Sequence, residues 1–175
     1  MEDFHRLIAE QIPRLRRYAW ALVRDASRAD DLVQDTLARA IAKAHLWQPG
    51  TNLLAWLFTL MHNQNVNTVR RALREGTTID VEQCSATLIA TTDPEGSCKL
   101  RELDRAISRL PKEQRQVLLL VGLEGIAYDD AASILRIPVG TVRSRLSRAR
   151  DTLRRLLDLG ESAGTSSAAR QAHAA

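Results

Sequence analysis

The sequence predicts an all-α protein of two small helical domains joined by a flexible linker. Apolar residues recur at helical spacing along most of the chain, and no stretch alternates apolar and polar residues over the length of a strand. A polar segment rich in Thr, Ser and Gly, residues 76–98, separates the periodic stretches and carries four acidic residues but no Lys or Arg before Lys99. The chain has 175 residues, of which 45% are hydrophobic, enough for two small domains. We expect domains at 1–75 and 99–160 and a disordered tail at 161–175.

The front domain, residues 1–75, is predicted to hold three helices. In the first, apolar residues return at i, i+3, i+4, i+7 and i+8, and after a polar break at residues 25–31 the second continues the helical recurrence of apolar residues. The third begins near Asn52, an N-cap that follows Pro49 and Gly50, and ends at Gly76. The two apolar stripes consist of Leu15, Tyr18, Ala19, Leu22 and Val23, and of Leu32, Val33, Leu37, Ala40 and Ile41.

The rear domain, residues 99–160, starts with two further helices. Apolar residues from Leu100 to Leu110 mark the first, which stops at Pro111. Proline fits the first turn of a helix because its missing N–H has no partner there, so Pro111 can open the helix that carries Val117.

The end of the rear domain has the pattern of a helix-turn-helix motif. A short helix at residues 128–135 is broken at 136–138, and the next helix places its apolar residues at i, i+4, i+7, i+11 and i+14. Its opposite face then carries arginines and hydroxyls, an arrangement that fits a DNA major groove. The segment from Arg136 to Arg155 holds seven arginines and one acidic residue, which favours DNA over the alternative, a solvated charged face. The inward stripe consists of Val142, Leu146, Ala149, Leu153 and Leu156.

The third helix carries a polar stripe of its own. Amides and arginines follow one another there at i, i+4, i+7, i+8 and i+11, on one face. Asn can address base edges, and Arg can hold a phosphate or stack on an exposed base. The loop from Trp47 to Asn52 could cradle an unpaired base. Packing in the core is the alternative for Trp47 and Trp56, and the commoner role of aromatics at helical spacing. The stripe consists of Asn63, Asn67, Arg70, Arg71 and Arg74.

Other classes of function find no support in the sequence. The four histidines are dispersed, and no nucleophile, base and orienting acid form a recognisable set, so we expect no catalysis, no cofactor and no metal site. Cys84 and Cys98 lack metal-ligand spacing and are expected to be unreactive thiols. No apolar run approaches the roughly 18 residues of a membrane span, and we expect a cytoplasmic protein.

Four segments, in this order, resemble the bacterial RNA polymerase sigma factors of the extracytoplasmic-function group. The segments are ADDLVQDTLARA (29–40), NLLAWLFTLMHNQNVNTVRR (52–71), LPKEQRQVLLL (110–120) and IPVGTVRSRLSRAR (137–150). The resemblance implies two helical domains, regions two and four, joined by a flexible linker. It also implies three partners: core RNA polymerase, docked through the coiled-coil clamp of its largest subunit, promoter DNA, and an anti-sigma factor.

The resemblance assigns roles to three groups of residues. The expected core-polymerase contacts are Asp31, Gln34 and Asp35, which would otherwise be read as a solvated acidic face. The expected contacts to the melted -10 element are Trp47, Asn52, Asn63, Asn67, Arg70 and Arg71. The expected -35 contacts are Arg143, Ser144, Ser147 and Arg148 nearest the bases, Thr141 and Arg145 on phosphates, and Pro138 at the helix start.

Three residues depart from the pattern of the family. Arg136 stands where the family often has Gly, so it must adopt a left-handed conformation, at roughly 1 kcal/mol, or shift the turn. Ala127 replaces a common capping Ser, a loss of roughly 1 kcal/mol unless Asp129 or Asp130 substitutes. Asn67 replaces a common Asp and so removes a negative charge beside the expected strand path.

The expected function is that of a promoter-specificity subunit, which reads a -35 duplex and captures melted -10 bases. Two alternatives remain. A sigma-like decoy that binds only an anti-sigma factor would not need the arginine face of the last helix. A dimeric helix-turn-helix regulator would need a ligand pocket or a dimerisation helix in residues 1–75, where the sequence instead ends in an amide-and-arginine stripe.

Overall fold

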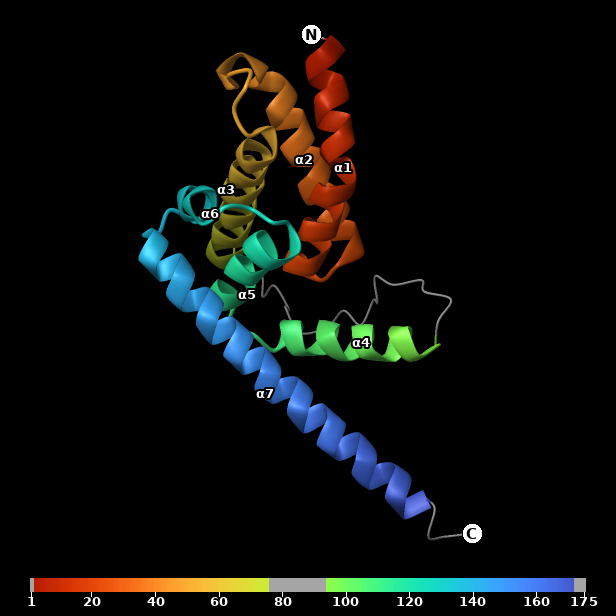
Figure 1. The fold of residues 1–175 in the computed structure, drawn as a ribbon. Helices are drawn as coiled ribbons and strands as arrows, with labels where there is room; N and C mark the ends of the chain where they lie inside the picture. Colours follow the sequence, from red (N-terminus) through yellow and green to blue (C-terminus); the bar gives the residue numbers. More distant parts are fainter. Residues whose placement is uncertain (1, 76–93, 172–175) are drawn as a thin grey trace. The chain divides into compact units, whose positions relative to one another are not determined.

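The computed structural model describes the backbone of residues 2–75 and 94–171 and the side chains of residues 3–75 and 99–158. Within these ranges the chain forms helices and no strand (Figure 1), which confirms the predicted all-α class. None of these helices is both long enough and apolar enough to cross a lipid bilayer. The elements are α1 (Glu2–Val23), α2 (Ala26–Ala42), the 3-10 turn η1 (Ala44–Leu46), α3 (Leu53–Arg74), α4 (Pro94–Ser108), α5 (Lys112–Leu118), the π-helical turn η2 (Leu119–Leu123), α6 (Tyr128–Leu135) and α7 (Val139–Gln171).

The contacts divide the chain into two compact units. Unit 1 comprises Met1–Ala86 and Leu119–Val142, and unit 2 comprises Thr87–Leu118 and Arg143–Ala175. This grouping follows from contacts of η2 with α1 and of α6 with α3. It differs from the boundary we expected at the linker, and the boundaries of the two domains stay predictions.

Two helices extend beyond their expected limits. Helix α4 begins at Pro94, inside the expected linker, because proline suits the first turn of a helix. Helix α7 continues to Gln171, into the tail for which we expected no regular structure, since an established helix adds further residues at little cost. The side chains of Cys84 and Cys98 and the expected helix end at Gly76 lie outside the described residues.

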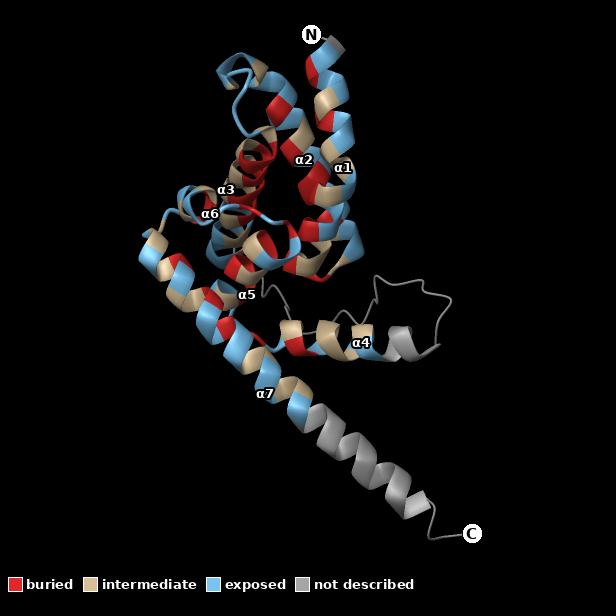
Figure 2. Cartoon of the chain, in the orientation of Figure 1, coloured by how far each residue is buried: buried red, intermediate tan, exposed pale blue. Residues whose placement is uncertain are grey.

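In unit 1, helices α1, α2 and α3 pack on one another around an apolar core. Tyr18 of α1 and Phe58 of α3 are fully buried, with ring centroids 4.8 Å apart and planes tilted by 57°. Figure 2 shows buried positions concentrated on α3 and on the adjoining parts of α1 and α2. Leu15, Ala19, Ala40, Leu57 and Met61 are likewise inaccessible to solvent in these three helices.

The break between α1 and α2 is shorter than the sequence indicates. We expected a polar break over residues 25–31, but α2 begins at Ala26. The reason is a cap: the Asp25 carboxylate accepts a hydrogen bond from the backbone N–H of Arg28 at 2.7 Å, so the polar residues that follow form the first turns of the helix. Arg24, at φ 59°, makes the left-handed turn between the helices.

We expect the buried hydroxyl of Tyr18 to make the stability of unit 1 sensitive to alkaline pH. Burial raises the pKa of Tyr18 well above its ordinary value of 10.0, and the nearby Glu124 carboxylate raises it further. A pKa that is higher in the folded state gives stability that is present below the unfolded pKa and is lost as the pH rises above it. We therefore expect the urea midpoint to fall as the pH increases from about 8 to about 11.

Replacing Tyr18 by Phe tests this expectation. Within the described residues the hydroxyl has no hydrogen-bond partner, so Tyr18→Phe should preserve stability near pH 8 and flatten the alkaline decline. Tyr128→Phe, at an exposed tyrosine, is the matched control and should keep the decline of the wild type. Equal slopes for all three proteins would contradict the role of Tyr18.

In unit 2, apolar side chains at the ends of α4 and α5 are buried. Leu110 is 4% exposed and Val117 is fully buried. The buried Arg115 guanidinium donates a hydrogen bond to the main-chain carbonyl of Ser108 at 3.3 Å and so links the start of α5 to the end of α4. Pro111 precedes α5, and its carbonyl accepts the hydrogen bond of the Arg115 N–H at 2.9 Å, as expected for a residue at a helix start.

Candidate nucleic-acid interface

Helix α7 has one buried side and one exposed basic side. Val142, Leu146 and Ala149 are at most 2% exposed, which confirms the predicted inward stripe over these turns. The stripe weakens further along, where Leu153 and Leu156 are only half-buried. Among the expected -35 contacts, Pro138, Arg143, Ser147 and Arg148 are exposed, and Thr141, Ser144 and Arg145 are half-buried.

In the turn between α6 and α7, Arg136 adopts the left-handed conformation, which was one of the two outcomes expected for this residue. Arg136 has φ 54° and ψ 47°, and its N–H reaches the carbonyls of Ala132 and Ser133 at the end of α6. The next N–H, of Ile137, donates to the Ala132 carbonyl at 3.1 Å, which completes the helix end. An arginine in this conformation costs roughly 1 kcal/mol relative to glycine.

The start of α6 lacks a side-chain cap. Ala127 occupies the N-cap position and makes no capping hydrogen bond. Asp129 and Asp130 lie in the first turn, where the helix dipole favours a negative charge, yet neither replaces the missing cap. The Asp130 carboxylate instead accepts a hydrogen bond from Asn52 Nδ2 at 3.0 Å.

The polar stripe of α3 lies mostly in solvent. Asn63 is half-buried, whereas Asn67 and the three arginines after it are exposed. Arg71 Nε donates to Glu75 Oε1 at 2.8 Å, and this hydrogen bond raises the pKa of Arg71. A solvent-exposed pair of this kind contributes little to stability.

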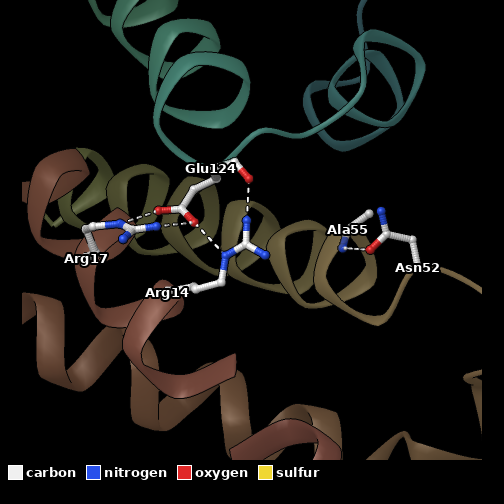
Figure 3. A network of polar contacts seen from close by, with 5 residues as sticks. All are labelled: Arg14, Arg17, Asn52, Ala55 and Glu124. Carbon is white, nitrogen blue, oxygen red and sulfur yellow. Dashed lines mark hydrogen bonds and ion pairs between the residues drawn. The ribbon is translucent and has the colours of Figure 1, made fainter. Parts of the chain in front are cut away.

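Aromatic and amide side chains in and after the loop that precedes α3 make contacts with other residues of the protein. The half-buried Trp47 ring lies 5.3 Å from the Phe4 ring, and the Trp56 ring lies 6.3 Å from the same ring. These ring contacts are of the kind that the packing alternative predicts, and the contact of Trp47 with a melted base stays a prediction. Asn52 caps α3 as predicted, since its Oδ1 accepts the Ala55 N–H at 3.1 Å (Figure 3), while its Nδ2 binds Asp130.

The acidic patch of α2 has the orientation that its spacing predicts. Asp31, Gln34 and Asp35 are exposed, whereas Leu32 and Val33 between them are buried. Asp35 Oδ2 also accepts a hydrogen bond from the Nε2 of Gln64, on α3, at 2.8 Å.

Figure 3 shows an ionic cluster of Arg14, Arg17 and Glu124, which follows η2. The Glu124 side chain is fully buried, while those of Arg14 and Arg17 are 38% and 45% exposed. Arg17 donates from Nε to Oε1 at 2.9 Å and from Nη2 to Oε2 at 3.0 Å, and this bonding raises its pKa. Arg14 donates from Nε to Oε2 at 3.0 Å and from Nη2 to the main-chain carbonyl of Glu124.

The sequence analysis did not predict this cluster, although the residues around Glu124 indicate a buried carboxylate. Glu124 is the single charged residue in the stretch from Leu118 to Ala127, which is otherwise apolar or glycine. A carboxylate in such a stretch is buried only when it is paired, and Arg14 and Arg17 lie on one face of α1 because they are three residues apart.

Two family models match the chain. One, described as the sigma2 domain of PhyR, matches residues 8–62, and the other, described as region 4 of sigma-70, matches residues 100–153. The sequence is 42% identical over 150 residues to the ECF RNA polymerase sigma factor EcfG of Rhodopseudomonas palustris (strain TIE-1). The aligned region covers 86% of this chain and 82% of the relative. It is 32% identical over 133 residues to the ECF RNA polymerase sigma factor SigC of Mycobacterium tuberculosis (strain CDC 1551 / Oshkosh), over 76% of this chain and 72% of the relative.

A solved structure is similar over nearly the whole chain. The co-crystal structure of the sigma factor RpoE with the anti-sigma factor NepR from Bartonella quintana matches with a TM-score of 0.78 and 37% identity, over 90% of this chain and 98% of that chain. Both family models, the relatives and this solved structure identify the same family as the four resembling segments do. The chain belongs to the extracytoplasmic-function group of RNA polymerase sigma factors, which direct the polymerase to promoters.

Proposed function

We propose that α7 reads the -35 element, that α3 holds melted -10 bases, and that the acidic patch of α2 docks on the clamp of core polymerase. The observation that carries the proposal is the two-sided character of α7. Its apolar residues are buried, and this burial leaves Arg143, Ser147 and Arg148 exposed on the opposite side. A helix that presents arginines and hydroxyls in its first turns has the chemistry to bond base edges and phosphates in a major groove.

The face of α3 supports a different kind of contact. Its amides lie toward the start of the stripe and its arginines toward the end, so bases and phosphates of one strand can be held along the same helix. Unpairing and unstacking a base from the duplex costs a few kcal/mol, and contacts of this kind offset that cost. The residues proposed for this role are Asn63, Asn67, Arg70 and Arg71 on the helix, with Trp47 and Asn52 in the loop before it.

We infer the partners of this chain from its family and its exposed acidic patch. Asp31, Gln34 and Asp35 offer acceptors to a basic surface, which we assign to the coiled-coil clamp of the largest polymerase subunit. A relative of known structure, RpoE of Bartonella quintana, is bound to the anti-sigma factor NepR, and we propose an anti-sigma partner for this chain as well. We place the protein in the cytoplasm, where bacterial RNA polymerase transcribes, with no cofactor and no catalytic step of its own.

Reconstitution with core polymerase tests the proposal. The protein should migrate with the core enzyme and enable transcription from specific promoters selected from a random library. A decoy would bind neither promoter DNA nor the polymerase productively. A conventional regulator would footprint an operator alone and ignore the core enzyme, and either result would contradict the proposal.

Reversing the charge of Asp35 tests the docking surface. Asp35→Arg should weaken binding to core polymerase about tenfold, because it replaces an exposed acceptor by a cation that repels a basic partner. Competition of unlabelled variants with labelled wild-type protein for core polymerase measures the change. Glu10→Arg makes the same reversal at an exposed position of α1 and should compete like the wild type. Equal affinities of the two variants would reject the docking role.

A further inference from the structure

The hydrogen bond between Gln64 and Asp35 links the acidic patch of α2 to helix α3. Asp35 is on the acidic patch of α2, and Gln64 is on α3, next to Asn63 of the polar stripe. Gln64 Nε2 donates to Asp35 Oδ2 at 2.8 Å across the packed helix pair, at a separation of 29 residues along the chain. The contact is therefore part of the tertiary structure and independent of local helix geometry.

The Gln64 amide is held with its two ends in different surroundings. The side chain is half-buried, and its Oε1 atom is buried without a hydrogen-bond donor among the described residues. Its Nε2 atom meets the exposed carboxylate of Asp35. This is an unusual use of glutamine, because a buried acceptor without a partner lowers stability.

An apolar residue of the same length would fill the position at lower cost. Methionine has the same reach and no buried carbonyl to satisfy. The polar residue thus stands where stability alone favours an apolar one, a conflict that is typical of functional positions. The gain from the amide is its one hydrogen bond, which fixes the Asp35 carboxylate.

The bond uses one oxygen of the Asp35 carboxylate and leaves the other able to accept a hydrogen bond. Within the described residues Asp35 Oδ1 accepts no hydrogen bond, so it can accept one from a cationic or N–H group of a partner. A carboxylate already fixed by one hydrogen bond loses less side-chain freedom when it binds than a freely rotating one.

We propose that Gln64 is a positioning residue for polymerase docking, which holds Asp35 Oδ2 so that Oδ1 meets a basic group on the core enzyme. This inference rests on the proposed docking role of Asp35. Gln64 itself does not contact the partner, and its effect passes through Asp35.

A double-mutant cycle on the full-length protein with reconstituted core polymerase tests the proposal. The variants are Gln64→Met, Asp35→Ala and the double variant, each in competition with labelled wild-type protein. Gln64→Met should weaken core binding about threefold to tenfold, the size expected for one hydrogen bond, while its urea midpoint stays equal to that of the wild type or rises. In the Asp35→Ala background, the same change should have no further effect.

Control variants separate this role from a structural one. Gln11→Met makes the same chemical change at a half-buried glutamine of α1 and should bind core polymerase like the wild type. Gln64→Leu also removes the donor and adds no charge to the acidic patch, and it should weaken binding as much as Gln64→Met. This variant keeps the test available if Gln64→Met folds poorly.

The outcomes are distinguishable. Wild-type affinity for both Gln64 variants, with weakened binding by Asp35→Arg, would overturn the role of Gln64 and leave the docking surface intact. Wild-type affinity for Asp35→Arg as well would reject the proposed docking and this inference with it. Additive effects of Gln64→Met and Asp35→Ala would overturn the inference too, because Gln64 would then act independently of Asp35.

Discussion

Replacing Glu124 by Ala should lower the free energy of unfolding by about 3 kcal/mol, the largest effect of any single substitution considered for this chain. The Glu124 side chain is fully buried and accepts hydrogen bonds from two guanidinium groups. Its removal leaves Arg14 and Arg17 beside a cavity without a counter-charge. The expected loss lies at the lower end of the range for buried pairs because both arginines are partly exposed to solvent.

Thermal and urea unfolding measure this loss. For a chain of this length, about 3 kcal/mol corresponds to a decrease of roughly 6–12 °C in the melting temperature. Glu75→Ala removes a carboxylate from an exposed pair with Arg71 and is the matched control, for which we expect a change within about 0.5 kcal/mol. If the two variants unfolded at the same temperature, the buried cluster would not have the stabilising role assigned to it.

Replacing Arg148 by Ala should change which -35 sequences the holoenzyme prefers. Arg148 is exposed on the proposed reading face, and its guanidinium lies 3.5 Å from the Ser144 hydroxyl, a contact too weak to hold it away from DNA. If it forms paired hydrogen bonds to a guanine, its loss should cost about 1–3 kcal/mol at one base position. Transcription from promoters that carry each base at each -35 position measures this preference.

Arg155 provides the control on the same helix. It is exposed beyond the proposed reading turns, and its Nη2 donates to the Thr152 hydroxyl at 3.2 Å. Arg155→Ala should leave the pattern of base preference unchanged. If it touches a phosphate, binding should weaken uniformly and depend less on salt. An unchanged pattern for Arg148→Ala would reject its proposed contact with a base.

The helices and their faces could be predicted because they depend on local spacing. The periodic return of Val142, Leu146 and Ala149 predicted the buried side of α7, and the capping role of Asn52 followed from its place after Pro49 and Gly50. The left-handed turn at Arg136 was one of two outcomes that the residue type allowed.

The remaining features depend on which helices meet, and spacing does not contain that information. The pairing of Glu124 with Arg14 and Arg17 joins residues more than a hundred positions apart, and that of Gln64 with Asp35 joins residues of two helices. The extent of α2 was missed for a different reason. Residues 26–31 look like a break by hydropathy, but the Asp25 cap stabilises them as helix.

The Glu124 cluster restricts how this sequence can change over evolutionary time. Loss of the carboxylate leaves two unpaired cations, whereas loss of one arginine leaves the carboxylate with a single, partly hydrated partner. Because each intermediate is less stable than the starting protein, these three positions should co-vary. Homologues with an apolar residue at the position of Glu124 should also have uncharged residues at the positions of both arginines.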